Sequence, residues 1–425
     1  MNSVGWKRVL IAEVCSSIID CVNRTAPEAS GVTPFKMIRT SNVRDGWIDL
    51  SSVKFVDEPT YLRWTRRQVP QMGDIVLTRE APLGEVGLIR SNDRVFLGQR
   101  LVSYRVDPTK ADNRFLLYAL QGEDLQSQIR AFGSGSTVEH MRVPDAKVLR
   151  VNLPSLETQR RIASILSAYD DLIENNTRRI AILEEMARRV YEEWFVHFRA
   201  PGCEDVELVG SPLGPVPKSW EISPLEDLCS RITDGAHHSP KTQSVGIPMA
   251  SVKDMRTWDF DVAGCRIIDR ADYEALVRND CRPLKGDVLI AKDGSYLKHA
   301  FVVREERELV ILSSIAILRP HESVSSDFLV QVLKDPRTVD RMKGVVSGVA
   351  IPRIILKDFS RFEIVFPPQS LRDRWDALVG PNAALCQRLF RLNANLRAQR
   401  DLLLPKLISG EIDVSQAEEL MEAAE

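Results

Sequence analysis

The residues of this sequence that could do chemistry are mainly hydrogen-bonding side chains at matching points of two similar stretches. In each stretch a Gly-Asp pair and a mostly apolar run precede a cation and then an acid, as Arg79-Glu80 and as Lys292-Asp293. Arg and Lys donate to base edges and phosphates, and carboxylates accept hydrogen bonds from base amino groups. These pairs predict contact with DNA, and the alternative for each is a solvated surface charge.

Further candidates for DNA contact are polar or small residues between apolar flanks. The first stretch contributes Arg39, Thr40, Asn42, Arg44, Ser134, Gly135, Ser136 and Thr137. The second contributes His237, His238, Lys253, Ser295, Lys298 and Ser347. Segments of this composition suit contact with phosphates or bases, and an ordinary turn is the alternative. A metal site at the two adjacent histidines is disfavoured, because no Cys or His cluster lies beside them.

The sequence lacks the motifs of several common catalytic sites. The only Pro-Pro pair, Pro367-Pro368, lacks the Asn or Asp before it and the aromatic residue after it that an adenine methyltransferase loop needs. No phosphate loop ending in Gly-Lys-Ser/Thr and no complete dinucleotide loop occurs. The seven cysteines form no CxxC pair, which suits reduced thiols in the cytosol. We therefore expect no catalytic residue, no metal and no cofactor in this chain.

Composition and charge limit the classes of protein to which this sequence can belong. A chain of 425 residues, 44% hydrophobic and 27% charged, predicts two or three soluble globular domains. No run of eighteen apolar residues and no secretory signal occurs, so we expect a cytoplasmic protein without membrane contact. The net charge is −2, but the last fifteen residues hold six acids and no Lys or Arg. The remainder therefore has a net charge of +4, which permits a local basic face.

An internal repeat must position the candidate residues. The segment from Trp6 to Asp20 (WKRVLIAEVCSSIID) is matched by the segment from Trp220 to Asp234 (WEISPLEDLCSRITD), at an offset of 214 residues. GDIVLTR is likewise matched by GDVLIAK, and Ser-Gly by Ser-Gly further on. Order and spacing are kept, which predicts one structural unit present twice.

Each copy is followed by a Pro and a long segment with apolar residues at alternating steps of four and three. This spacing predicts helices that pack lengthwise on each other. The first predicted seam contains Ile162, Leu166, Tyr169, Ile173, Asn176, Ile180, Leu183 and Trp194. The second contains Leu378, Asn382, Leu385, Leu389, Leu392 and Leu396. The alternative is that each helix packs only on its own domain.

The ends and interruptions of these helices are also predicted. Ser155 is a candidate N-cap of the first helix. Gly380-Pro381 is expected to kink or divide the second helix, and Pro405 and Gly410 to end it. One Asn in each seam, Asn176 and Asn382, is a residue type that can fix register.

The resulting fold class is α+β, with two similar mixed α/β domains separated by two long antiparallel coiled-coil helices and a pseudo-twofold repeat. The predicted segments are the first globular domain 1–153, the first helix 154–199, a Pro/Gly-rich linker 200–219, the second globular domain 220–366, the second helix 367–410 and an acidic tail 411–425. Small helices are expected at 113–131 and 326–343. Such a molecule would hold two domains at a set distance along B-DNA.

Several stretches resemble the specificity subunit of type I restriction–modification systems. They are PSLETQRRI from Pro154, LGPVPKSW from Leu213, LLLPKLISGEIDV from Leu402, DGAHHSP from Asp234 and the two Gly-Asp runs. The resemblance covers nearly the whole chain in family order, and implies a DNA-reading subunit without catalysis of its own. It implies a bipartite double-stranded DNA target, with one half for each target-recognition domain and a nonspecific spacer.

The resemblance also implies partners. In this family the helices set the spacer and dock two methyltransferase subunits, which bind S-adenosylmethionine and methylate adenine. Two restriction and translocase subunits complete the restriction enzyme. Two other hypotheses remain at this point, a scaffold whose twin domains bind proteins and a self-contained enzyme. Sequence-selective, salt-dependent DNA binding would favour a DNA-reading subunit over the scaffold. Catalytic activity of the lone chain would indicate the self-contained enzyme.

Overall fold

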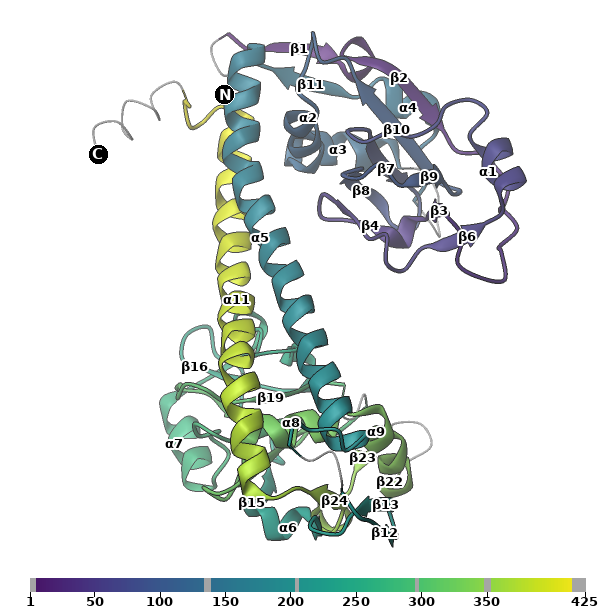
Figure 1. Cartoon of the computed structure of the whole chain (residues 1–425). Helices are drawn as coiled ribbons and strands as arrows, with labels where there is room; N and C mark the ends of the chain where they lie inside the picture. Colours follow the sequence, from purple (N-terminus) through teal and green to yellow (C-terminus); the bar gives the residue numbers. More distant parts are fainter. Residues whose placement is uncertain (1–4, 134–138, 203–205, 295–297, 348–352, 415–425) are drawn as a thin grey trace, which may run out of the picture. The chain divides into compact units, whose positions relative to one another are not determined.

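The structure, a computed structural model, describes residues 5–133, 139–202, 206–294, 298–347 and 353–414. The chain divides into two compact units, Met1–Ile173 with Leu396–Glu425, and Glu174–Asn395. The division falls within two long helices, α5 (Leu156–Tyr191) and α11 (Gln369–Ser409), so each unit contains part of both (Figure 1).

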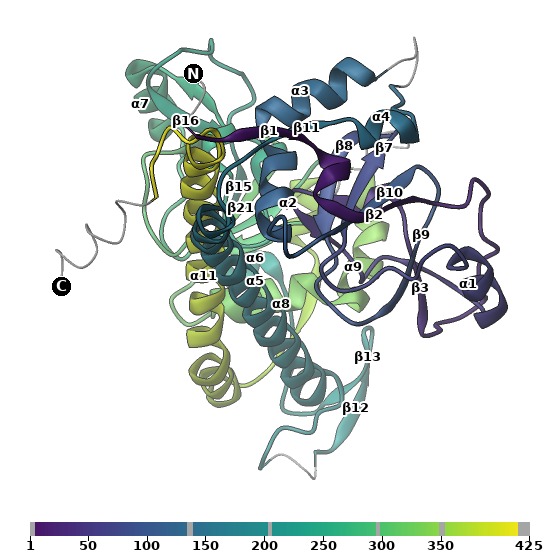
Figure 2. The same ribbon diagram turned by 90° about the horizontal axis from the view of Figure 1, so that it is seen from above.

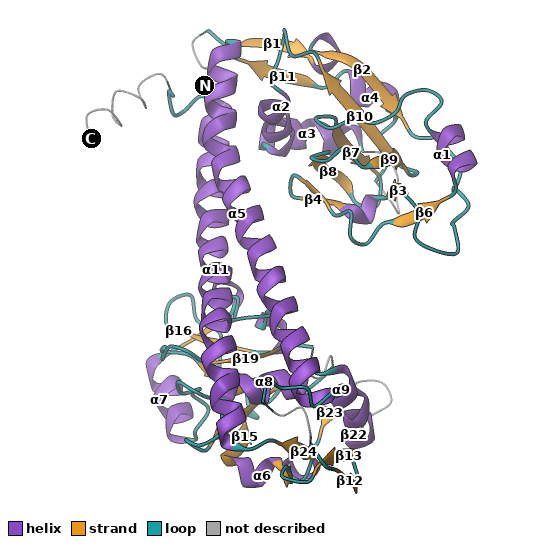
Figure 3. Ribbon diagram, in the orientation of Figure 1, coloured by secondary structure: helices purple, strands orange, loops and turns teal. Residues whose placement is uncertain are grey.

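The first unit combines a four-stranded sheet, a three-stranded sheet and the two-stranded pairs β1–β11 and β4–β5 with short helices. Figure 3 shows these strands and helices by colour. Its strands are β1 (Lys7–Leu10), β2 (Cys15–Asp20), β3 (Phe35–Ile38), β4 (Val43–Arg44), β5 (Trp47–Ile48), β6 (Lys54–Val56), β7 (Ile75–Arg79), β8 (Leu83–Leu88), β9 (Arg94–Leu97), β10 (Leu101–Val106) and β11 (Arg150–Leu153). Its helices are α1 (Glu58–Trp64), α2 (Asn113–Gln121), α3 (Glu123–Phe132) and α4 (Val143–Lys147). The sheet orders are β2-β10-β7-β8, all antiparallel, and β6-β3-β9, in which β3 and β9 run parallel.

The second unit repeats this arrangement. Its strands are β12 (Leu208–Ser211), β13 (Gly214–Pro217), β14 (Glu221–Pro224), β15 (Cys229–Asp234), β16 (Ile247–Ala250), β17 (Arg266–Ile268), β18 (Val288–Ala291), β19 (Ala300–Val302), β20 (Val310–Ile311), β21 (Ile315–Pro320), β22 (Val346–Ser347), β23 (Arg353–Ile354) and β24 (Glu363–Phe366). Its helices are α6 (Leu225–Leu228), α7 (Arg270–Arg278), α8 (Ser326–Lys334), α9 (Pro336–Met342) and α10 (Leu356–Ser360).

The strand orders of the second unit match those of the first. They are β15-β21-β18-β19 and β17-β16-β20, with β16 and β20 parallel. The β14–β24 pair corresponds to β1–β11. The repeat predicted from sequence is therefore confirmed at the level of topology.

The paired Gly-Asp motifs build the same clamp in both units. Asp74 accepts hydrogen bonds from Arg105 Nε and Nη2, both at 2.8 Å. Asp287 accepts the same two bonds from Arg319, at 2.8 and 2.9 Å. Both carboxylates are buried, so each motif ties the start of one central strand to its neighbour. The glycine before each Asp has a positive φ, which explains that residue type at this turn.

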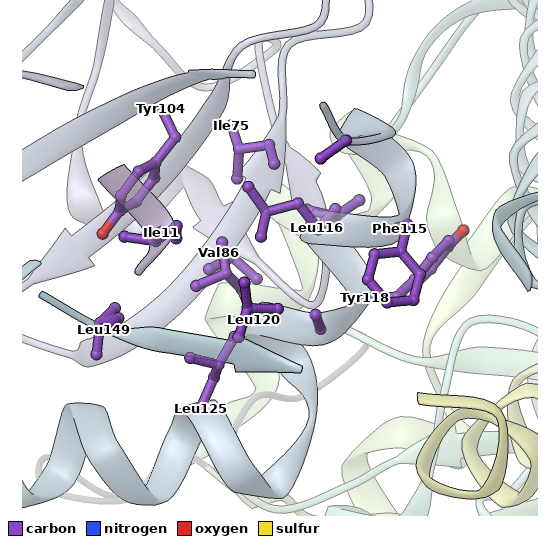
Figure 4. Packing of buried hydrophobic residues seen from close by; sticks show 14 of the residues in the cluster. Ile11, Ile75, Val86, Tyr104, Phe115, Leu116, Tyr118, Leu120, Leu125 and Leu149 are labelled. Atoms are coloured by element: carbon purple, nitrogen blue, oxygen red, sulfur yellow. The ribbon is translucent and has the colours of Figure 1, made fainter. Parts of the chain in front are cut away.

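The core of the first unit lies between its four-stranded sheet and α2 and α3 (Figure 4). Tyr104 and Phe115 are fully buried there. The C-terminal end of α11 contributes Leu404 and Leu407, and Val414 follows from the chain beyond it. The motif LLLPKLISGEIDV thus completes the core of the N-terminal domain. A small satellite core places Tyr61 of α1 against Phe35 of β3 and Phe96 of β9. Figure 2 shows α1 next to these two strands.

The core of the second unit is completed in the same way by α5. Tyr191 lies 5.9 Å from Trp375 between ring centroids, and Phe195 lies 5.3 Å from Trp375. Trp375 belongs to α11 and is fully buried. The predicted linker 200–219 contains the hairpin β12–β13, which the Pro/Gly composition did not reveal.

The predicted small helices are each split in two. Gly122 has an extended backbone between α2 and α3, in keeping with the low helix propensity of glycine. Asp335 separates α8 from α9 and caps α9 by accepting from Arg337 N at 2.9 Å. A proline follows Asp335 at the first helical position, where its missing N–H costs nothing.

The helix ends follow the predictions only in part. Ser155 caps α5 by accepting from Thr158 N at 3.2 Å, and Gly410, with a φ of 73°, ends α11. A π-helical turn, Glu192–Val196, follows α5. The predicted division at Gly380-Pro381 and end at Pro405 are wrong, because α11 continues through both. The two prolines, and the residues four positions before them, are exposed, so water can satisfy the carbonyls that proline leaves unpaired.

The helix seam is polar at several positions that apolar spacing overlooks. In α5, Ile162, Leu166, Ile173 and Asn176 are buried, and Tyr169, Ile180, Leu183 and Trp194 are partly buried. In α11, Leu389 is buried and Leu385 and Leu396 are partly buried. Leu378 and Leu392 were placed in the seam wrongly, because they are 47% and 44% exposed. The residues one position later, Val379 and Asn393, are buried instead.

Polar pairs explain this shift in the seam. Within the second unit, Asn176 Nδ2 donates to Asn393 Oδ1 at 2.9 Å. Within the first, Arg400 Nη1 donates to Asp170 Oδ1 at 2.6 Å, and all four residues are buried. Asn382, the predicted polar position of the second seam, donates to Leu378 O of its own helix. In each unit the two helices meet with opposite chain directions, as predicted. No helix among the described residues is long and apolar enough to cross a membrane.

Candidate nucleic-acid interface

The candidate interface of the first unit lies where β7 ends. There Arg79 N donates to Arg100 O at 2.8 Å, and Arg79 O accepts from Met141 N at 3.0 Å. Glu80 forms an isolated antiparallel bridge with His140. Three segments far apart in the sequence, 79–80, 100 and 140–141, thus meet in one backbone arrangement, which we call the reading frame of the unit.

The second unit has the same reading frame. Lys292 N donates to Ser314 O at 2.9 Å, and Lys292 O accepts from Ile354 N at 3.0 Å. Asp293 forms an isolated antiparallel bridge with Arg353. Every backbone contact described for the first unit therefore has its counterpart here.

The cation of each cation–acid pair, Arg79 or Lys292, is enclosed by protein within the reading frame. Arg79 is buried and donates from Nη1 to Met141 O at 3.0 Å. Lys292 is buried and forms an ion pair with Asp234, whose other oxygen lies 3.0 Å from His237 Nε2. The prediction that Arg79 and Lys292 contact DNA is corrected by their burial, because a side chain enclosed by protein cannot reach a base.

The exposed side chains on the reading frame differ between the units. In the first, Glu80 lies between His140 Nδ1 at 3.2 Å and Arg100 Nε at 3.3 Å. In the second, Asp293 accepts two hydrogen bonds from Arg353, at 2.9 and 3.1 Å. The arrangement can donate and accept hydrogen bonds at a surface.

A second matched feature is a turn after β3 and β16. Asn42 is buried, and its Oδ1 accepts from Arg39 N at 2.9 Å. Asp254, also buried, accepts from Ser251 N at 2.8 Å in the same place. Asn42 also donates to Ser52 Oγ at 3.0 Å, so its amide is used within the turn. The prediction that Asn42 contacts DNA is therefore corrected.

The other candidates fall into three groups. Arg44, His237, His238, Lys253 and Lys298 are exposed, and Arg39 and Thr40 are partly buried. Ser134, Gly135, Ser136, Thr137 and Ser295 lie outside the described residues. Ser347 lies in β22, and its side chain is also outside the description. The exposed and partly buried residues of this group stay predictions for DNA contact, as do Glu80 and Asp293.

Sequence reasoning missed Arg100, His140 and Arg353. The sequence signal was weak, because His140 and Arg353 occupy equivalent places but differ in type. Their position becomes evident only from the bridges that join them to Glu80 and Asp293. An alignment of the two units by strand register would have found them.

The described His, Cys, Asp and Glu side chains bear on metal binding and covalent chemistry. Within the described ranges, no cluster of three His, Cys, Asp or Glu residues could hold a metal ion. Burial raises the pKa of the Cys15, Cys229 and Cys265 thiols to about 12, so these thiols are protonated at neutral pH. Burial, and then the charge of Lys298, lowers the pKa of His299 near the second reading frame.

Comparison with known proteins gives a consistent result. Residues 5–185 match the family model of the type I restriction modification DNA specificity domain. The type I restriction enzyme MjaIX specificity subunit of Methanocaldococcus jannaschii is 24% identical over 352 residues, which cover 81% of this chain and 78% of that protein. The HindI specificity subunit of Haemophilus influenzae is 23% identical over 331 residues, covering 62% of this chain and 69% of that protein.

The fold is shared with a solved structure. The S subunit of a type I restriction–modification system from M. genitalium aligns over 96% of this chain and 97% of its own, with a TM-score of 0.61 and 17% identity. This alignment spans both units of the chain, whereas the family model spans the first unit and part of α5. The first part of the chain is thus similar to the type I restriction modification DNA specificity domain, and the chain as a whole is similar in sequence to specificity subunits of type I restriction enzymes.

Proposed function

We propose that this protein is the DNA-specificity subunit of a type I restriction–modification complex, in which each unit recognises one half of a bipartite duplex target. The observation that carries the proposal is the reading frame, which has the same backbone contacts in both units but different exposed side chains. A repeated frame presents side chains at the same place on a duplex, and different side chains select different bases.

The helices α5 and α11 set the number of unspecified base pairs between the half-sites. Both helices pass through both units, and the Asn176–Asn393 hydrogen bond supports one fixed register. An α-helix rises about 1.5 Å per residue, so helix length is convertible into distance along DNA. The spacer is then a property of the helices and is independent of the bases that each domain selects.

The same helices supply the docking surface for two methyltransferase subunits. Six apolar side chains of α5 and α11 are 44% to 69% exposed: Leu172, Ile182, Met186, Leu378, Leu392 and Leu402. Ile182 and Met186 lie one helical turn apart on α5, and an exposed apolar pair of this kind is available to a protein partner. The methyltransferase subunits bring S-adenosylmethionine and the catalytic groups for adenine methylation, and restriction and translocase subunits join this complex. The chain itself contributes recognition and no catalysis.

Selection of bound DNA tests the proposal. The complex of this chain with its methyltransferase partner should enrich, from a random duplex library, two short motifs separated by a fixed number of unspecified base pairs. Binding should weaken steeply as salt is raised, because phosphate contacts release counterions. The purified chain alone should not methylate DNA when S-adenosylmethionine is added. Bound DNA without a shared motif would favour a protein-binding scaffold instead.

A further inference from the structure

The side chain of Arg353 is exposed yet held in one orientation. Its Nε donates to Asp293 Oδ1 at 2.9 Å, and its Nη2 donates to Asp293 Oδ2 at 3.1 Å. The Arg353 side chain is 60% exposed, whereas that of Asp293 is only 17% exposed. The carboxylate is therefore fixed in the protein, and the bidentate pair fixes the plane and direction of the guanidinium.

The free edge of this guanidinium carries paired donors. An arginine has five N–H groups, and Asp293 takes two of them along the edge from Nε to Nη2. No other hydrogen bond of Arg353 is found in the part of the chain that the structure describes. The outer edge, formed by Nη1 and Nη2, is left with two N–H groups side by side. Two donors at that spacing match O6 and N7 of guanine in the major groove.

The place of Arg353 in the reading frame indicates a role in selecting bases. The internal clamps of the two units are the same in type, Asp74 with Arg105 and Asp287 with Arg319. One exposed position of the frame itself differs, being His140 in the first unit and Arg353 in the second. Two domains that fold alike but recognise different half-sites need this combination of identical support and different surface side chains.

We propose that Arg353 is a specificity-determining residue of the second unit, which recognises a guanine of one half-site in the major groove, with Asp293 as its positioning residue. This inference rests on the proposed function and adds the base that one side chain selects. A phosphate contact requires only charge, whereas a guanine contact requires the plane of the guanidinium to be set, which Asp293 does.

The test uses the complex of the full chain with its methyltransferase partner and a panel of duplexes. The panel contains the target motif of the wild-type complex and every single base-pair change within it. Arg353→Lys keeps the charge but loses the paired donors, so preference for one G·C pair in one half-site should fall by about 5- to 150-fold. Asp293→Asn should lower preference at the same base pair, because it loosens the same guanidinium.

A matched control is available within the same unit. Arg270 is 57% exposed and is also held by a carboxylate, through Nη1 and Nη2 to Glu308. It lies at the start of α7, outside the reading frame. Arg270→Ala should leave the preference at every base pair unchanged, which separates base recognition from a general loss of positive charge.

Two results would overturn the proposal. One is an unchanged base preference in Arg353→Lys and Arg353→Ala complexes that bind as tightly as wild type. The other is a weakening that is equal for every duplex of the panel, because that pattern belongs to a phosphate contact. Thermal melting of the variant complexes identifies a folding defect, and Arg353→Gln then serves as a further variant with a neutral side chain. If the wild-type complex selects no sequence at all, the proposed function itself has failed, which is a different outcome.

Discussion

Asn176 of α5 donates a hydrogen bond to Asn393 of α11, with 2.9 Å between Nδ2 and Oδ1, and both side chains are buried. Asn393 also donates to Thr177 Oγ1 at 3.2 Å. A buried amide pair stabilises only the register in which the two amides meet, because any slip leaves each one unsatisfied in an apolar seam. The pair is therefore suited to fix how α5 and α11 align.

Substitution of this pair should separate stability from register. Asn176→Leu removes the N–H donor to the buried Asn393 Oδ1, and should lower the free energy of unfolding by about 1–3 kcal/mol. Asn176→Leu combined with Asn393→Leu should recover much of that loss but permit alternative helix alignments. Chemical denaturation measures the first effect, and assembly with the methyltransferase partner measures the second. Equal stability of the single variant and wild type would contradict the role of the pair.

A buried ion pair within the first unit gives a second prediction. Asp170 is 1% exposed and accepts from Arg400 at 2.6 Å and from Tyr118 Oη at 2.7 Å. Burial, and then the charge of Asp170, raises the pKa of Tyr118, so its hydroxyl stays a donor. Arg400→Met should cost about 3 kcal/mol of stability, because it removes the hydrogen-bonded cation of this carboxylate and leaves only the more distant Arg90, at 3.8 Å.

The control for this prediction removes both charges. Asp170→Leu added to Arg400→Met should restore part of the lost stability, because it removes the buried charge but also takes away the acceptor of Tyr118 Oη. Thermal melting of the four proteins of this cycle gives the coupling energy. A double variant as unstable as the sum of the two single variants would show that the charges do not interact.

The clamps of the two units should behave alike. Asp74→Asn and Asp287→Asn each weaken two charge-assisted hydrogen bonds to an arginine, so each should cost about 1.5–3 kcal/mol. Neither residue is exposed, so neither change should alter the target sequence. Urea denaturation and DNA selection measure the two properties. A changed target motif would mean that the clamps act in base recognition.

Matched heptad insertions test the spacer proposal. Seven residues added to α5 between Asn176 and Ile180, and seven to α11 between Leu389 and Asn393, preserve the seam and add roughly 10 Å of helix. The spacer should grow by about three base pairs at 3.4 Å each, with the half-site sequences unchanged. An insertion into α5 alone should impair assembly, because the buried pairs can no longer meet. An unchanged spacer in an active double insertion would refute the proposal.

The sequence predicted the repeat and the paired long helices because these leave long, regular patterns. It placed Leu378 and Leu392 in the seam wrongly, because apolar spacing cannot anticipate that Asn393 and Arg400 are buried through polar partners in α5. Continuity through Gly380-Pro381 was missed for a related reason, since solvent exposure decides whether proline is tolerated.

The candidate site was less predictable than the fold. Arg79 and Lys292 are at the right place in the chain, but their burial depends on Met141 and Asp234, which are distant in sequence. Arg353 was not identified, because only a strand bridge brings it to Asp293. Side-chain exposure at such a site is set by tertiary pairing, which no local pattern encodes.

The most direct test of the central claim is a map of methylated adenines in a host that carries this chain with its methyltransferase partner. The account predicts one modified sequence in two short parts, separated by a constant number of unspecified bases, and lost when this chain is deleted. Exchange of residues 220–366 for those of a relative should change one part only. A single continuous motif, or methylation that persists without the chain, would contradict the account.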